Sequence, residues 1–151
     1  MNRSKSTNLK TETIMKKMLI LMALICATVA TNAQDLRNSN NSFIGRIESD
    51  GTVRNSSNSC IGKIERDGTI RNASNASIGK IDSSGTIRNA NNSSIGKVES
   101  DGTVRNGSNS TIGKIDSSGT VRNSNNSTIG YAKGVPVKYA AVFFFFDFFK
   151  H

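Results

Sequence analysis

The sequence contains few of the residues from which catalytic and metal sites are usually built. It has no tryptophan, one proline, two cysteines and a single histidine, which is the last residue, His151. No Cys/His, Ser/His/Asp or HExxH arrangement can be assembled from this set. The scarcity of cysteine and proline also excludes a disulfide scaffold and a collagen-like rod. We therefore expect no catalytic residue, no cofactor and no metal site, and predict that the chain is not an enzyme.

Neither cysteine is predicted to have a special role. Cys26 follows Ile25, whereas lipid-modified cysteines follow a small residue, so a lipid anchor is not expected. Cys60 is then the only cysteine in the mature chain and cannot form an intramolecular disulfide. Serine or threonine fills the equivalent position in the other repeats, at Ser77, Ser94, Thr111 and Thr128. Cys60 is interpreted as a small side chain in a structural position.

The first 33 residues have the composition of a signal peptide. Five basic residues and one acidic residue give this stretch +4 of the chain's formal charge of +9. Two lysines precede the apolar run Met18 to Val29, and the small residues Thr31 to Ala33 follow it. The run has about a dozen residues, whereas a spanning helix needs roughly 20. We predict a start at Met1 or Met15, cleavage before Gln34, export to the periplasm or beyond, and no transmembrane span in the mature chain.

A 17-residue repeat dominates the rest of the chain. The dipeptide Ile-Gly occurs at positions 44, 61, 78, 95, 112 and 129, and each of the first five begins a complete unit. A sixth unit is divided between the ends of the repeat region. Its second half is Leu36 to Phe43 and its first half is Ile129 to Tyr131, so these fragments can meet to complete one unit.

Each unit is predicted to form a β-hairpin. Residues Glu48 to Thr52 match a three-residue hairpin loop in which Gly51 adopts a positive φ. This loop sets Ile47 opposite Val53, and the same apolar pair recurs as Ile64/Ile70, Ile81/Ile87, Val98/Val104 and Ile115/Val121. The pairs define the buried face, and the alternate positions face solvent. The polar segment Asn55 to Ser59 is predicted to be the turn that joins one hairpin to the next.

One hairpin cannot be stable by itself. About three apolar side chains per unit contribute roughly 2 kcal/mol each on burial, against a conformational entropy cost of about 1.5 kcal/mol per ordered residue. Neighbouring units must therefore stack. The predicted fold is all-β, with repeated 17-residue hairpins in a closed flower-like arrangement. The alternative is a β-solenoid with an aromatic C-terminal cap, in which Asn55, Asn72, Asn89, Asn106 and Asn123 would stack as a ladder.

The C-terminal segment 134–151 differs sharply in composition. After Gly134-Val135-Pro136 it contains six of the seven phenylalanines, within the stretch Tyr139 to Phe149. The segment is apolar all round, which is typical of a segment buried on every side. We predict a plug or cap for the repeats, and an exposed aromatic patch or an aggregating segment are alternatives. The expected organisation is a signal peptide (1–33), a β-hairpin repeat domain (34–133) and this Phe-rich segment (134–151).

The repeat and the ending together resemble a known family. The Ile-Gly-Lys-Ile, Asp-Gly-Thr-Val-Arg-Asn and Ser-Asn-Ser patterns, followed by the Phe-rich ending, are similar to those of the bacterial five-fold β-flower proteins over residues 36–150. The resemblance implies an exported protein of flower-like all-β fold without an established biochemical activity. It brings no catalytic or binding residues to this chain. The chain has five whole units and a divided sixth, so its number of units differs from the five in the family's description.

Acidic residues occupy two positions of the repeat. Asp50, Asp67 and Asp101 precede the turn glycines, but Ser84 and Ser118 fill the same position, which therefore requires a turn-forming residue. One aspartate per turn, absent from two units, cannot supply the ligands that Ca²⁺ requires. The second acidic position holds Glu48, Glu65, Asp82, Glu99 and Asp116.

Basic residues occupy two further positions on the same face. These positions hold Arg46, Lys63, Lys80, Lys97, Lys114 and Arg54, Arg71, Arg88, Arg105, Arg122. A face of mixed charge is typical of a solvated surface with weak ion pairs. Nucleic-acid binding requires an excess of basic residues with interleaved aromatics, which the repeats lack.

These patterns predict an exported, noncatalytic structural or interaction module with unknown ligand-binding residues. Because every unit repeats the same donors and acceptors, an anionic or hydroxyl-rich glycan or envelope polymer is the favoured ligand class. The alternative is a self-assembling or adhesin-like surface protein joined through exposed phenylalanines or unpaired strand edges.

Overall fold

The computed structural model describes residues 34–149. The predicted signal peptide, including Cys26, and the single histidine, His151, lie outside the described residues. The described residues form twelve strands and one helix. The strands are β1 (Gln34–Asn38), β2 (Phe43–Ile47), β3 (Thr52–Asn55), β4 (Cys60–Ile64), β5 (Thr69–Asn72), β6 (Ser77–Ile81), β7 (Thr86–Asn89), β8 (Ser94–Val98), β9 (Thr103–Asn106), β10 (Thr111–Ile115), β11 (Thr120–Asn123) and β12 (Thr128–Tyr131). The helix is α2 (Val137–Phe145).

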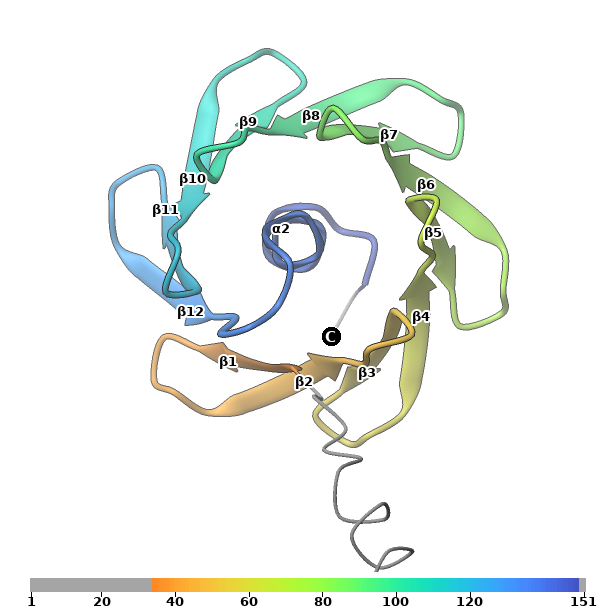
Figure 1. Cartoon of the computed structure of the whole chain (residues 1–151), viewed down its shortest axis with the longest axis horizontal. Helices are drawn as coiled ribbons and strands as arrows, with labels where there is room; N and C mark the ends of the chain where they lie inside the picture. Colours follow the sequence, from red (N-terminus) through yellow and green to blue (C-terminus); the bar gives the residue numbers. More distant parts are fainter. Residues whose placement is uncertain (1–33, 150–151) are drawn as a thin grey trace, which may run out of the picture. The chain divides into compact units, whose positions relative to one another are not determined.

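The strands close into one antiparallel ring, in which neighbours along the chain are neighbours in the sheet (Figure 1). The ring closes where β1 pairs with β12, with Arg37 opposite Tyr131. This pair corresponds to Lys114 and Arg122 in a complete unit. The two halves of the divided unit therefore meet, as their sequences predicted. The fold is the predicted closed flower-like arrangement and not the alternative β-solenoid.

The hairpins have the predicted register. Ile47 is opposite Val53, Gly51 has a φ of 87°, and its N–H donates to the carbonyl of Glu48 at 2.9 Å. The carbonyl of Gly51 accepts the N–H of Ile64 from the next unit at 2.9 Å, which links each turn to its neighbour. We call these five connections the tight turns, at residues 48–51, 65–68, 82–85, 99–102 and 116–119.

The loops between hairpins are held by asparagine side chains. Oδ1 of Asn55 accepts the N–H groups of Ser57 and Ser59, both at 3.0 Å, and Asn58 adopts a left-handed φ of 64°. In the described ring these asparagines therefore serve their own loops rather than a ladder. A β-bulge at Ile61, next to the loop, splays the strands. The six loops, which we call the Asn loops, project outward like petals (Figure 1).

A layer of apolar side chains lines the inside of the ring. Each of its members is at most 3% exposed. They are Leu36, Ile47, Val53, Ile64, Ile70, Ile81, Ile87, Val98, Val104, Ile115, Val121 and Ala132. In the divided unit, Leu36 and Ala132 occupy the two positions of the apolar cross-strand pair. The alternate residues of the first hairpin, Arg46, Glu48 and Thr52 among them, are half-buried rather than fully exposed.

Helix α2 lies at the centre of the ring (Figure 1). Pro136 immediately precedes it, a position that suits proline because the first helical N–H groups have no partner within the helix. Ala140, Ala141 and Val142 have no exposed surface. Nζ of Lys138 donates to the carbonyls of Asp82 and Ser83 at 3.2 and 2.7 Å, which ties the start of the helix to one tight turn.

Phenylalanine rings from the C-terminal segment lie against the glycines of the Ile-Gly dipeptides. A methyl group added to Gly62 would lie 2.5 Å from the ring of Phe149, and one added to Gly96 would lie 2.5 Å from the ring of Phe146. The same contact joins Gly79 with Phe148, Gly113 with Phe145 and Gly130 with Phe144. At Gly45 the nearest atoms instead belong to the backbone of β3. A ring of six glycines thus receives five phenylalanines.

Candidate binding surface

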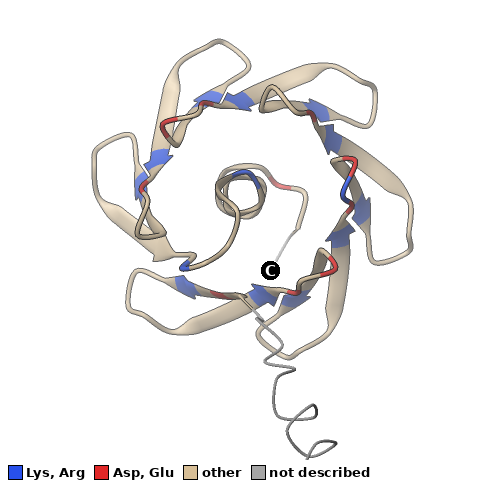
Figure 2. Ribbon diagram, viewed as in Figure 1, with Lys and Arg blue, Asp and Glu red and all other residues tan. Residues whose placement is uncertain are grey.

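A belt of basic residues follows the outer face of the ring. The strand register places two cations directly opposite each other in every complete hairpin (Figure 2). The pairs are Arg46/Arg54, Lys63/Arg71, Lys80/Arg88, Lys97/Arg105 and Lys114/Arg122. Like charges in directly opposite positions are destabilising by themselves. We call these ten residues the basic belt.

The second residue of each pair is an arginine with a structural task. Nη1 of Arg54 donates to the carbonyl of Asn58 at 3.1 Å, so it stabilises the left-handed residue of the Asn loop. Corresponding bonds are made by Arg37, Arg71, Arg88, Arg105 and Arg122. Arg54 also donates through Nε to Glu48 at 2.7 Å, and this hydrogen bond raises the pKa of Arg54 above its ordinary value.

The carboxylates close the tight turns in two interchangeable ways. Asp50 accepts the backbone N–H and the hydroxyl of Thr52. Where serine replaces this aspartate, as at Ser84, the preceding acidic residue is Asp82, which accepts the Ser84 hydroxyl and the N–H of Thr86. Every turn therefore keeps one carboxylate as an acceptor. This explains the two combinations found in the repeats. A glutamate at the first of these positions occurs with an aspartate two residues later, and an aspartate at the first position occurs with a serine two residues later.

These hydrogen bonds lower the pKa of all five turn aspartates. The N–H of Thr52 is the largest cause at Asp50, and the Ser84 hydroxyl is the largest at Asp82. The pKa values of Asp67, Asp101 and Asp116 are lowered in the same ways. Carboxylates held in their charged form by local turns are suited to structure rather than to proton transfer at neutral pH.

Four of the five pairs contain a lysine, and each of these lysines follows the tight turn of the preceding unit. Lys63 forms an ion pair with Asp50 at 3.3 Å, and Lys114 forms one with Asp101 at 2.9 Å. Lys97 instead follows the turn that contains Ser84, beside a surface hollow of about 380 Å³. Within the described residues, Lys80, Arg88 and Lys97 form no ion pair, and both lysines are exposed. We call these three residues the central basic cluster.

The members of this cluster lie on neighbouring strands. Lys80 is directly opposite Arg88. Lys97 is opposite Thr86, two positions along β7 from Arg88, so Lys97 and Arg88 are diagonal neighbours. Arg88 lacks a glutamate partner because Asp82 is shorter and is held by its own turn. The exchange of acidic residues in this turn thus leaves Arg88 and Lys97 without an ion pair, whereas Lys80 lies near enough to Asp67 to help lower the pKa of that carboxylate.

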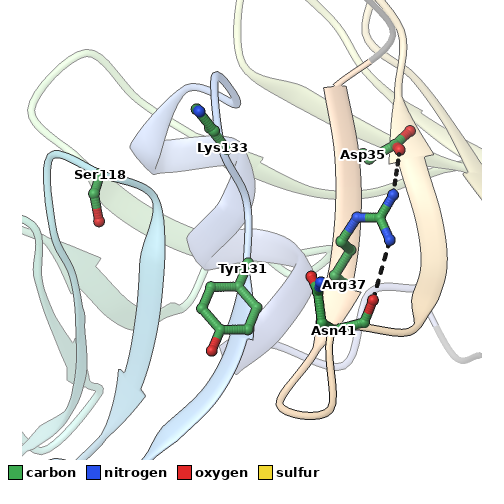
Figure 3. Close-up of a pocket in the computed structure, with 6 residues that line it drawn as sticks. All are labelled: Asp35, Arg37, Asn41, Ser118, Tyr131 and Lys133. Carbon is green, nitrogen blue, oxygen red and sulfur yellow. Dashed lines mark hydrogen bonds and ion pairs between the residues drawn. The ribbon is translucent and has the colours of Figure 1, made fainter.

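A second distinct site lies at the closure of the ring. The divided unit has no tight turn, and a pocket of about 420 Å³ lies between the turn at Ser118 and strand β1. We call it the seam pocket, and it is lined by Asp35, Arg37, Asn41, Ser118, Tyr131 and Lys133. Figure 3 shows Tyr131 between Ser118 on one side and Arg37 with Asn41 on the other. Arg37 donates to the carboxylate of Asp35 at 3.2 Å and to the carbonyl of Asn41 at 3.0 Å.

The sequence patterns located the basic belt but not the seam pocket. Tyr131 occupies the position that lysine or arginine holds in the complete units. Alignment of the divided unit with the complete units is enough to show this exchange of a basic residue for tyrosine. The sixth unit aligns Tyr131 with Lys114, but the contribution of Lys133 depends on the path taken by the chain beyond the repeat.

The described residues show no sign of a metal centre. Among them, no three His, Cys, Asp or Glu side chains are grouped so that they could hold an ion. Cys60 is exposed, and its Sγ lies 3.7 Å from the carbonyl of Gly62. Over residues 34–149, no helix is long and apolar enough to cross a bilayer.

Comparison with known proteins relates the chain to a described family. The family model described as 5-fold beta-flower protein matches residues 33–149. No curated protein and no solved structure matches the chain. The matched segment includes all twelve strands and the Phe-rich segment through Phe149. Five tight turns and five Phe–Gly contacts occur within its ring of six units.

Proposed function

This chain belongs to the 5-fold beta-flower family and is a small repeat protein, and on that premise we propose that it is an exported, noncatalytic module that binds an anionic polymer of the bacterial envelope. The single observation that supports this proposal is the basic belt, which repeats an opposed pair of cations at a fixed register around a closed ring. A polymer with regularly spaced negative charges can engage several such pairs at once, and binding then gains from multivalency.

The central basic cluster is the favoured contact within the belt. Lys80 and Lys97 are exposed, so their ammonium groups can reach a ligand without breaking an ion pair. Arg88 is held by the carbonyl of Asn92 at 3.2 Å, which fixes its guanidinium beside them. A preordered cation flanked by two lysines that form no ion pair among the described residues favours a carboxylate- or phosphate-bearing chain over a neutral one.

Export fits the position of β1. The signal-peptide interpretation predicts cleavage before Gln34, and Gln34 is the first residue of β1. Cleavage there leaves intact the strand that closes the ring, whereas cleavage a few residues later would remove it. N-terminal sequencing of secreted protein tests this part of the proposal. A mature chain beginning at Met1 or Met15 would contradict it.

Polymer binding is tested with polygalacturonate, neutral dextran and duplex DNA as probes in isothermal titration calorimetry. We expect binding of polygalacturonate that weakens as salt is raised, because screening attenuates exposed charges. The double variant Lys80→Gln/Lys97→Gln should weaken it more than the matched variant Lys63→Gln/Lys114→Gln, whose lysines are already paired with aspartates. Equal binding by the wild type and both variants, or no binding at low salt, would refute the proposal.

The self-assembly alternative receives less support from the fold. It relied on unpaired strand edges and exposed phenylalanines, but each strand of the described ring has two neighbours. Phe143, Phe146 and Phe149 are at most 8% exposed. Analytical ultracentrifugation separates the two functions, because a self-assembling protein would sediment as a concentration-dependent series of oligomers.

A further inference from the structure

The seam pocket interrupts the basic belt with different chemistry. In the five complete hairpins the outward position of the first strand is basic, whereas in the sixth it is Tyr131, opposite Arg37. On its other side Tyr131 is opposite Thr120 of β11. An aromatic ring thus stands where the belt has a cation, at the one unit that lacks a tight turn.

The pocket has the size and lining of a small-molecule site. Its volume of about 420 Å³ falls in the range of about 300–1,000 Å³ that is usual for ligand pockets. Tyr131 is half-buried and offers a flat apolar surface with a hydroxyl at its edge. Arg37, Asn41 and Ser118 add polar groups on both sides of the ring. A flat face bordered by hydrogen-bonding groups matches a pyranose, which has an apolar face and an equatorial rim of hydroxyls.

The charges around the pocket do not cancel. Asp35 is paired with Arg37 at 3.2 Å, and within the described residues Lys133 forms no ion pair and is exposed. Arg37 uses Nη1 and Nη2 for Asn41 and Asp35, while its Nε–H makes no bond among those described. One unbalanced positive charge thus remains beside the aromatic ring, and a ligand with one negative charge would neutralise it.

We propose that the seam pocket binds a single carboxylated pyranose, a hexuronate, with its apolar face on Tyr131 and its carboxylate toward Lys133. This inference rests on the proposed function, because it specifies the sugar of the polymer that the basic belt engages. The pocket recognises one residue of the polymer, and the belt binds the chain that continues from it.

The decisive variant is Tyr131→Lys, which installs the residue found at the same position in unit five, Lys114. This change keeps the repeat pattern and adds a positive charge while removing the aromatic face. Titration of the mature protein with glucuronate, followed by NMR, should give binding that Tyr131→Lys weakens by about tenfold. Unchanged or tighter glucuronate binding by Tyr131→Lys would overturn the proposal, because simple charge attraction would then suffice.

Two further probes identify the role of Lys133. Lys133→Gln should reduce the preference for glucuronate over glucose, and acetate should not compete because it lacks the pyranose face. Competition by acetate at the same concentration as glucuronate would contradict a sugar site. Thermal unfolding of each variant verifies that it is folded, and Arg66→Gln is the matched control, because Arg66 is exposed and lies outside both the belt and the pocket.

The outcomes distinguish this inference from the function on which it rests. If polygalacturonate binds through Lys80 and Lys97 while glucuronate does not bind, the seam-pocket proposal is wrong and the belt proposal stands. If glucuronate binds with the dependence on Tyr131 described above while polygalacturonate shows no dependence on the belt, the belt proposal is wrong and the sugar site stands.

Discussion

At the scale of single residues, five of the six Ile-Gly glycines meet two constraints. A Cβ atom at Gly96 would lie 2.5 Å from the carbonyl oxygen of Arg105 on the opposite strand and 2.5 Å from the ring of Phe146. At Gly45 the opposing carbonyl of Arg54 is also close, but the nearest atoms include no phenylalanine. The sequence therefore contains a natural comparison between a glycine required by the backbone alone and glycines required by backbone and ring together.

Gly96→Ala should destabilise the protein more than Gly45→Ala, because the alanine must displace both a strand and a packed aromatic ring. Overpacking of this kind costs about 1–3 kcal/mol. Gly107→Ala is the control, since its nearest neighbours are 3.4 Å away. Chemical denaturation of the three variants measures the order. Equal losses for Gly45→Ala and Gly96→Ala would show that the phenylalanine imposes no constraint of its own.

The turn aspartates give the fold a defined pH dependence. Their pKa values in the folded protein lie below the ordinary value of 3.8. Each carboxylate therefore contributes stability at pH values above this value and loses that contribution as the pH falls through the lowered pKa. The melting temperature should be nearly constant from pH 7 to 5 and should fall below pH 4. A melting temperature that rises on acidification would contradict the assigned turn bonds.

The exchange between the two types of tight turn can be reproduced in unit one. Asp50→Ser removes the acceptor for the N–H of Thr52 and should lower the melting temperature. Adding Glu48→Asp recreates the arrangement of Asp82 and Ser84, so the double variant should regain much of the loss. Denaturation curves of the single and double variants measure the recovery. A double variant less stable than Asp50→Ser would show that the two arrangements are not equivalent.

At the scale of elements, the repeat predicts the hairpins more completely than the C-terminal segment. The register of Ile47 with Val53 follows from the turn residues and the period of two, both of which are local. The helix could not be predicted, because a segment that is apolar on all sides has no helical period to detect. Its contacts, such as Phe145 with Gly113, join residues far apart in sequence, and no local pattern encodes them. The seam pocket was missed for the same reason, because opposite ends of the repeat region form it.

The Phe-rich segment should contribute strongly to stability despite its short length. Phe146 is 8% exposed and Phe149 is 2% exposed. Replacement of a buried phenylalanine by alanine costs about 3–5 kcal/mol through lost burial and the cavity left behind. Phe149→Ala should therefore lower the free energy of unfolding substantially, whereas Asp147→Ala, at an exposed position between them, should change it little. Similar stability of the two variants would show that the rings are not part of the core.

At the scale of the whole molecule, stability depends on closure of the ring. Strand β1 pairs with both β2 and β12, and Leu36 supplies a fully buried member of the inner layer. Its removal would expose edges on two strands and open the interior around α2. In an open array the loss of an end strand is local, but in this ring five of the six units contact the same C-terminal segment through their Ile-Gly glycines.

A chain that begins at Asn41 should therefore unfold at a much lower temperature than one that begins at Gln34. Leu36→Ala separates the two contributions, because it retains the backbone pairing of β1 and should cost about 2–5 kcal/mol through the lost side chain alone. The truncated chain should lose more than this, since it also loses the hydrogen bonds that close the ring. Circular dichroism during heating measures both, and amide exchange should show reduced protection in units distant from the seam. A truncated chain that kept its melting temperature, or lost protection only in β2 and β12, would mean that the units are stabilised by their immediate neighbours and that closure is not required.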